Sequence, residues 1–315
     1  MRTTSFPSEL HSVGARVKVT RVVSAETTVK QRMAEIWRAR ELLVYLVRTE
    51  IKVKYKNSFL GLLWSMVSPA LTLLVFTVVF GSILRSGMPN FVIFLFSGLL
   101  VWNFFQTGVL TATGVIVNNA GLVKKVSFPR EILALAAIGS AGVFFFFQLI
   151  VLLIFMVVLR VQPAWSMLYL FFAGLVPAIV LASALGIFLA AVNVYMRDTQ
   201  HLVTVLVAAA WFWACPIVYS YQLQVAPILK AHHLQWLFFV NPMTPLVMTF
   251  QRVIYNRPGE VPSTVAPHAP ITVLPPWPAT TYLWADAAVL AGALVLFYVA
   301  MVVFGRLAGN FAEEL

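Results

Sequence analysis

Charge is what this sequence has least of. Only 10% of its 315 residues are Asp, Glu, Lys or Arg, and 61% are hydrophobic. Soluble domains carry roughly 25% charged residues, so the composition excludes an ordinary soluble enzyme. Cations outnumber acids by 22 to 11. We attribute that excess to loops that face lipid headgroups, and we predict a polytopic membrane protein with no nucleic-acid partner.

Cysteine and nucleotide-binding motifs are also scarce. The single cysteine, Cys215, lies in an apolar run, so no disulfide can form within the chain. The first long apolar run starts near residue 59, too far along for a cleaved leader. No Gly-Lys dipeptide occurs, which excludes a P-loop. Energy for any work must therefore come from another polypeptide.

Acidic residues are nearly missing from the apolar runs. Ion-coupled transporters usually keep an ionisable group at depth, but only Asp286 lies near the end of such a run. A membrane-embedded glycosyltransferase needs outer carboxylates, and only Glu260 and Asp286 qualify. The neighbours His232 and His233 would point about 100° apart on a helix, and no cysteine or carboxylate completes a metal set. We expect no catalytic residue, cofactor or metal in this chain.

Long apolar runs are what the sequence has instead. A span needs about 20 such residues, and six stretches qualify: 59–84, 91–117, 132–159, 168–194, 202–219 and 282–304. We predict an all-α fold in which residues 58–315 form a six-span domain. The loop at 220–281 is too polar to span, and its apolar pieces 234–240 and 245–254 predict short re-entrant gate helices.

The residues before the first span have a different character. Residues 1–30 are polar, and we expect a flexible N-terminus there. Over 31–52 apolar and charged residues fall on opposite helical faces, which predicts an amphipathic helix in the membrane interface rather than one packed on a soluble domain. Lys52, Lys54 and Lys56 follow as a basic collar, so that 31–57 form one unit.

The distribution of cations sets the predicted orientation. With six spans and a cytoplasmic N-terminus, 17 of the 22 lysines and arginines fall inside. This positive-inside bias predicts that both termini are cytoplasmic. The 118–133 loop is then cytoplasmic as well. Within it Phe128 and Pro129 break any continuous helix, because proline disfavours helical backbone in the residue before it.

Aromatic residues are abundant in and beside the spans. Two interpretations compete, since aromatic rings pack against lipid and neighbouring helices but also stack on sugar rings. The candidates for a sugar path are Trp102, Phe105, Trp211, Trp213, Tyr219 and Tyr221.

Four motifs in order resemble the membrane subunits of ABC-2 polysaccharide exporters. They are LGLLW at 60–64, LVKKVSFPREIL at 122–133, NVYMRD at 193–198 and NPMT at 241–244. The resemblance covers residues 31–315, and its most specific part is the 122–133 loop. It implies a homodimer of six-span subunits in the bacterial cytoplasmic membrane, with two separate ATPase subunits that bind ATP and magnesium.

The resemblance also implies a cargo and residue roles. The cargo would be a glycan on a polyprenyl diphosphate lipid, such as O-antigen or cell-wall galactan. Contact with the ATPase would involve Glu35, Arg38, Lys124, Lys125, Phe128, Pro129, Arg130 and Glu131. Arg197 and Asp198 would brace the exit of the fourth span, and the collar would attract the diphosphate. The alternatives are an exporter of small lipids or drugs, a membrane-embedded glycosyltransferase and a structural scaffold.

Overall fold

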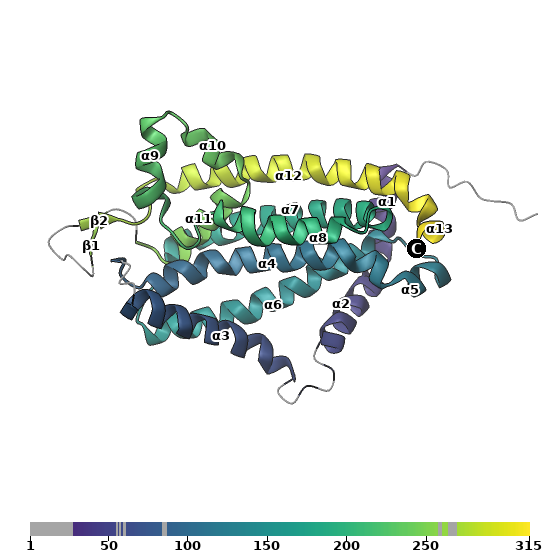
Figure 1. Ribbon diagram of the computed structural model, residues 1–315, viewed down its shortest axis with the longest axis horizontal. Helices are drawn as coiled ribbons and strands as arrows, with labels where there is room; N and C mark the ends of the chain where they lie inside the picture. The colour runs from purple at the N-terminus through teal and green to yellow at the C-terminus, as the bar shows by residue number, and fades with distance from the viewer. Residues whose placement is uncertain are drawn as a thin grey trace, which may run out of the picture.

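Long antiparallel helices form the body of the protein. The computed structural model describes residues 28–54, 56, 58, 61–83, 87–257, 260–263 and 270–315. Within these residues, four helices are long and apolar enough to cross a membrane. They are built on α4 (Phe91–Asn118), α6 (Glu131–Val158), α7 (Leu168–Tyr195) and α12 (Ala279–Leu307), and Figure 1 shows them running side by side. Most of the predicted N-terminal segment 1–30 lies outside the described residues.

Helix α4 is the centre of the bundle. Its most apolar window is 83% buried, against 28% for α6 and 22% for α12. It packs on α6 and on α7, and α7 in turn packs on α12. The small residue Gly186 permits α7 to approach α4 closely, because a Cβ there would lie 2.9 Å from the Cβ of Ala112. The outer faces of α6 and α12 expose large apolar side chains such as Val157 and Tyr298, as expected of surfaces that face lipid.

Two of the predicted spans correspond to shorter helices. The stretch 59–84 contains α3 (Trp64–Phe76), which continues through a π-helical turn at Thr77–Ile83. The stretch 202–219 overlaps α8 (Thr199–Val205) and contains a π-helical turn at Leu206–Trp211. The predicted end at 219 is wrong, because the helix stops near residue 213. Pro216 explains the stop, since it disfavours helical backbone at Cys215.

The N-terminal amphipathic segment is two helices rather than one. The stretch predicted as an amphipathic helix divides into α1 (Val29–Arg38) and α2 (Arg40–Lys54) at Ala39. Helix α2 packs along α6. The Lys54 amine lies 4.0 Å from the ring centre of Phe144, about 20 Å along α6 from its start at 1.5 Å per residue. Lys54 of the basic collar therefore lies beside the middle of α6 rather than beside its end.

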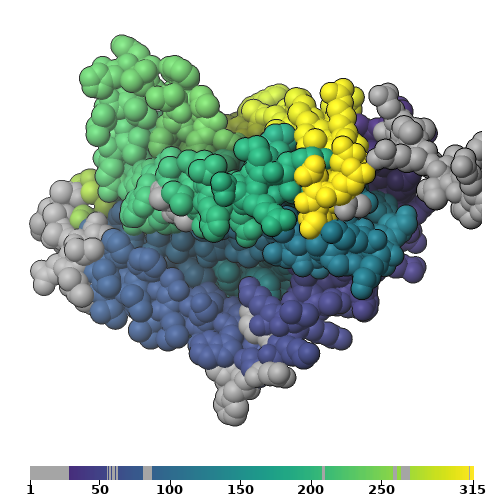
Figure 2. All heavy atoms as spheres, turned by 45° about the vertical axis from the view of Figure 1, so that its right-hand side comes forward, coloured from purple at the N-terminus to yellow at the C-terminus, as the bar shows by residue number. Residues whose placement is uncertain are grey.

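The region between α8 and α12 folds into short elements at one end of the bundle. They are a π-helical turn at Tyr221–Val225, α9 (Ala226–Ala231), α10 (Gln235–Val240) and α11 (Met243–Ile254), followed by the antiparallel strands β1 (Glu260–Pro262) and β2 (Pro270–Thr272). This hairpin is a small exception to the predicted all-α fold. Every residue of α11 is buried, whereas α9 and α10 stand off the body in Figure 2.

The other end of the bundle collects both ends of the described chain. Figure 1 places α1, α5 (Ala120–Lys125) and α13 (Phe311–Glu314) together there, opposite α9 and the β-hairpin. Short 3-10 turns at Gly61–Leu63, Trp165–Met167 and Ala308–Asn310 complete the chain. The first described helix, the 118–133 loop and the C-terminus thus share one face of the molecule.

Candidate functional site

An open groove of about 690 Å³ lies where α1, the 118–133 loop and the end of α12 meet, and we call it the end groove. Six residues proposed from the sequence line it: Glu35, Arg38, Phe128, Pro129, Arg130 and Glu131. Arg32, Ser127, Gly305 and Ala308 also contribute. The sequence alone did not predict that the end of α12 lines this groove.

A partly buried ion pair holds three segments of the groove together. Arg32 on α1 donates to the Glu131 carboxylate at 2.7 Å, where α6 begins. The same guanidinium donates to the Gly305 carbonyl on α12 at 3.4 Å. The Glu131 side chain is only 4% exposed and that of Arg32 17%. Within this single subunit, the Glu131 carboxylate, which we expect to contact the ATPase, is paired with Arg32.

Arg130 ties the same loop to the C-terminal segment. Its guanidinium donates to the Ala308 carbonyl and lies 5.7 Å from the ring centre of Phe311. Burial lowers the pKa of Arg130 from its ordinary value, and the charge of Glu131 opposes that shift. Nearby, the Tyr195 hydroxyl donates to the Leu307 carbonyl at 2.8 Å. The end of α7 is therefore fastened to the end of α12.

Other predicted residues of this end lie on the surface. Lys124 and Lys125 are exposed on α5, outside the lining of the end groove. Arg197 and Asp198 are exposed as well. Two other residues make side-chain contacts at the end of α7: Tyr195, and Asn193, whose side-chain oxygen accepts from the Gln200 amide at 3.2 Å. The exposed charges at this end include the cations Arg38, Lys124 and Lys125 and the acids Glu35, Glu313 and Glu314.

The candidate sugar-path residues do not form one surface in this subunit. Trp102 and Phe105 are buried and pack against Phe212 and Trp211, with ring centres 5.7 and 5.1 Å apart. Tyr221 is buried too. Tyr219 is half-buried and donates to the Trp213 carbonyl. Within the single subunit, Trp102, Phe105 and Tyr221 are therefore packed against other side chains.

Several polar contacts fasten α11 within the bundle. The Asn241 side-chain oxygen accepts from the Trp211 indole at 2.7 Å and from the Met243 amide at 3.0 Å. Its amide nitrogen lies 3.2 Å from the Cys215 sulfur. Farther along α11, the Thr249 hydroxyl donates to the buried Asp286 carboxylate of α12 at 3.1 Å. Asp286 thus holds two helices together and is not an exposed outer carboxylate. Among the described residues, no group of three His, Cys, Asp or Glu side chains could hold a metal.

Comparison with known proteins agrees with this architecture. Residues 41–255 match the family described as ABC-2 type transporter. The chain is 32% identical over 228 residues to the O-antigen export system permease protein RfbA of Myxococcus xanthus, covering 71% of this chain and 84% of that protein. It is 26% identical to RfbA of Klebsiella pneumoniae over 216 residues, which cover 69% and 81% of the two chains.

A more distant relative handles another polymer. The polysialic acid transport protein KpsM of Escherichia coli is 24% identical over 229 residues, covering 69% of this chain and 81% of that protein. The chain belongs to the ABC-2 type transporter family and is a multi-pass membrane protein. These relatives are named as permeases or transport proteins rather than enzymes.

Proposed function

We propose that this chain is the membrane subunit of an ATP-driven exporter of lipid-linked polysaccharide. The observation that carries the proposal is the match over most of the chain to O-antigen export permeases. The proposed membrane-spanning helices contain few ionisable residues. This scarcity also favours an energy source outside the chain. The cargo class is a glycan on a polyprenyl diphosphate, with O-antigen or cell-wall galactan as examples.

The proposed topology has six crossings. Helix α3 with its π-helical turn, and α8 with the turn that follows, would add two crossings to the four long helices. Both termini then lie in the cytoplasm, with the end groove on the cytoplasmic side and α9, α10 and α11 outside. The cation bias favours this orientation. Helices α10 and α11 would act as re-entrant gate helices.

The proposed partners are a second copy of this chain and two ATPase subunits that bind ATP and magnesium. We assign the end groove as the place where each ATPase docks. Its exposed cations, Arg38 with Lys124 and Lys125 beside it, favour an acidic element on the ATPase, because complementary charges guide association.

Force transmission follows from the contacts of the groove. The 118–133 loop begins α6 at Glu131, and Arg32 joins that point to α1 and α12. A push on the loop would therefore move α1, α6 and α12 together, since helices are stiff and the ion pair links them. The movement would part the seam between the two copies and open a path.

The basic collar has a proposed role along this path. Lys52, Lys54 and Lys56 are exposed, and Lys54 lies beside the middle of α6. Cations at the level of the middle of α6 would attract a diphosphate headgroup that has already moved away from the cytoplasmic surface.

Reconstitution tests the proposed function. The permease and its ATPase are placed in proteoliposomes with a radiolabelled lipid-linked polysaccharide, and polymer reaching the far leaflet is measured with ATP or a non-hydrolysable analogue. We expect ATP-dependent transfer of the polymer. Transport of a small amphiphilic dye without transport of the polymer would favour the drug-exporter alternative and contradict the proposal.

A further inference from the structure

Helix α11 and the face of α12 beside it bury three side-chain polar atoms that have no hydrogen-bond partner among the described residues. They are the hydroxyl of Thr244, the Nε of Arg252 and the Oδ2 of Asp286. Arg252 is 6% exposed and Asp286 only 1%. A buried charged group that is left partly unpaired is costly, so it usually marks a second arrangement of the site in which it is paired.

Each of the two charged residues has a neutral partner in this structure. The Arg252 guanidinium donates to the side-chain oxygen of Asn256 at 3.0 Å, one turn farther along α11. The other oxygen of Asp286 accepts from the Thr249 hydroxyl at 3.1 Å. The cation and the carboxylate thus lie at the same buried boundary between α11 and α12. A bond between them would satisfy both orphan atoms, because a guanidinium and a carboxylate form paired charge-assisted hydrogen bonds.

The two charged residues are separated by about one helical turn. Thr249 and Arg252 are three positions apart on α11, so their side chains project from the same face of that helix. Thr249 faces Asp286, and Arg252 interacts electrostatically with Tyr282, four positions before Asp286 on α12. The two helices are therefore antiparallel at this boundary, and Arg252 lies one turn closer to the start of α12 than Asp286 does.

The Arg252 side chain needs only a small change to reach the carboxylate. A long side chain on a helix normally covers the turn that precedes its own Cα. For Arg252 this is the turn of Thr249, which lies against Asp286. The bond with Asn256 draws the guanidinium in the other direction. Once that bond breaks, the usual rotamers of Arg252 direct the guanidinium back toward Asp286.

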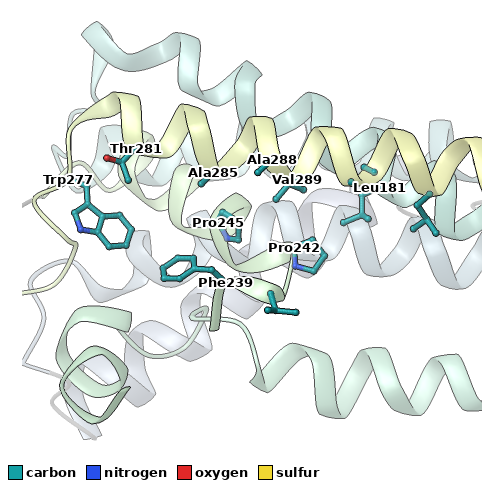
Figure 3. A pocket seen from close by; sticks show the side chains of 13 residues that line it. Leu181, Phe239, Pro242, Pro245, Trp277, Thr281, Ala285, Ala288 and Val289 are labelled. Atoms are coloured by element: carbon teal, nitrogen blue, oxygen red, sulfur yellow. The ribbon is translucent and has the colours of Figure 1, made fainter. Parts of the chain in front are cut away.

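An open groove of about 590 Å³ beside this boundary leaves α12 room to shift against α11. Figure 3 shows Ala285 and Ala288 of α12 on one side of the groove, and Pro242 and Pro245 at the start of α11 on the other. Methyl side chains form only a low ridge, so they interlock little with the prolines. A shift of α12 in the direction of its own start would carry Asp286 toward Arg252.

We propose that Arg252 and Asp286 form an ion pair in the ATP-bound state of the transporter and are apart in the state that this structure shows. The inference rests on the proposed function, in which the ATPase pushes on the end groove. Arg32 donates to Gly305 at the far end of α12, so this push would move α12 in the direction of its start. The pair would then hold α11, a proposed gate helix, in its ATP-bound position.

The nucleotide affinity of the assembled transporter tests the pair. The full-length permease is reconstituted with its ATPase in nanodiscs, and binding of a fluorescent, non-hydrolysable ATP analogue is titrated. A pair that forms only with nucleotide stabilises the bound state. Asp286→Asn and Arg252→Met should therefore each weaken analogue binding roughly tenfold, the value of one charge-assisted contact. The double variant should be no weaker than either single variant, because both remove the same interaction.

A third variant should have the opposite effect. Asn256→Gly releases Arg252 from its present partner and should strengthen analogue binding roughly fivefold, the value of one ordinary hydrogen bond. Glycine is chosen because Asn256 has a left-handed backbone with φ of 50°. Asn90→Gly, at another left-handed position with φ of 52°, is the matched control and should leave the affinity unchanged. Thermal unfolding without nucleotide verifies folding, and Asp286→Asn and Asn256→Gly still decide if Arg252→Met does not fold.

The outcomes separate this inference from the proposed function. Unchanged analogue binding in Asp286→Asn, or losses that add in the double variant, would overturn the pair. Unchanged or weaker binding in Asn256→Gly would overturn it as well. In each of these cases the ATPase still binds the permease, so the proposed function stands. A permease that forms no complex with the ATPase would defeat the proposed function, and the pair with it.

Discussion

At the scale of single residues, one buried carboxylate organises the end groove. Glu131 begins α6, and Arg32, 99 positions earlier, neutralises it and reaches Gly305. The sequence motif pointed to Glu131 but not to its partner, because nothing in the local pattern around Arg32 specifies a contact so distant along the chain. The sequence could likewise predict that Phe128 and Pro129 form a loop, but not that the C-terminal segment packs on it.

Removing Arg32 should destabilise the subunit. Arg32→Met leaves Glu131 buried without a partner, and we expect a loss of roughly 2–3 kcal/mol, below the usual cost of a broken buried pair because Arg32 is partly exposed. Thermal unfolding of the detergent-solubilised protein measures it. The double variant Arg32→Met with Glu131→Gln should recover part of the loss. Arg38→Met, at an exposed cation, serves as the control, and an equal loss there would contradict the assignment.

Glu50 on α2 should make stability depend on pH. Burial raises the pKa of its carboxyl above the ordinary 4.5, and a hydrogen bond with Ser140 opposes that shift. Its ionisation in the folded state is therefore unfavourable, and stability falls as pH rises from 4.5 through the raised pKa. Glu50→Gln should unfold at a higher temperature than the parent above that range and at the same temperature below it. A parallel pH profile in Glu50→Gln and the exposed control Glu41→Gln would refute this.

At the scale of elements, hydrophobic length predicted the long helices well. Residues 91–117, 132–159 and 168–194 lie within one or two residues of α4, α6 and α7. The hydrophobic pattern predicted helix ends less well where backbone geometry sets them. Examples are Ala39 between α1 and α2 and Pro216 after α8. The two-stranded hairpin was not predicted either, because each strand has only three residues.

Asn241 should be necessary for the position of α11. Its side chain joins Trp211 and Cys215 to the first turn of that helix. Asn241→Ala leaves the indole donor unpaired, and we expect a loss of about 1–3 kcal/mol of stability. Thermal unfolding followed by tryptophan fluorescence measures it. Gln224→Ala, an exposed amide nearby, should change little, and equal behaviour of the two variants would show that the network contributes nothing.

At the scale of the whole molecule, the position of the end groove links topology to function. The cation bias assigned the 118–133 loop and both termini to one side, and the structure brings α1, this loop and α13 to one end. Which residues close the groove depends on the packing of α12 against α7, and a single sequence does not contain that information. The same holds for the depth of Lys54 beside Phe144.

Charge reversal should separate docking from folding. Lys124 and Arg38 are exposed, so Lys124→Glu with Arg38→Glu should leave the subunit folded in the membrane. We expect the pair to abolish stimulation of ATP hydrolysis by the permease, because the cationic rim no longer attracts the ATPase. Arg160→Glu, a reversal of an exposed cation at the opposite end, is the control. If Lys124→Glu with Arg38→Glu still gave full stimulation of ATP hydrolysis, these two cations would be excluded from docking.

The most direct test of the central claim, that the end groove faces the cytoplasm and receives the ATPase, is labelling of Ser127→Cys. Ser127 is exposed in the groove, whereas the native Cys215 is buried and gives a low background. An impermeant maleimide should label Ser127→Cys in inverted vesicles stripped of the ATPase, and adding the ATPase back should prevent labelling. Labelling in intact spheroplasts, or labelling that the ATPase leaves unchanged, would contradict the account.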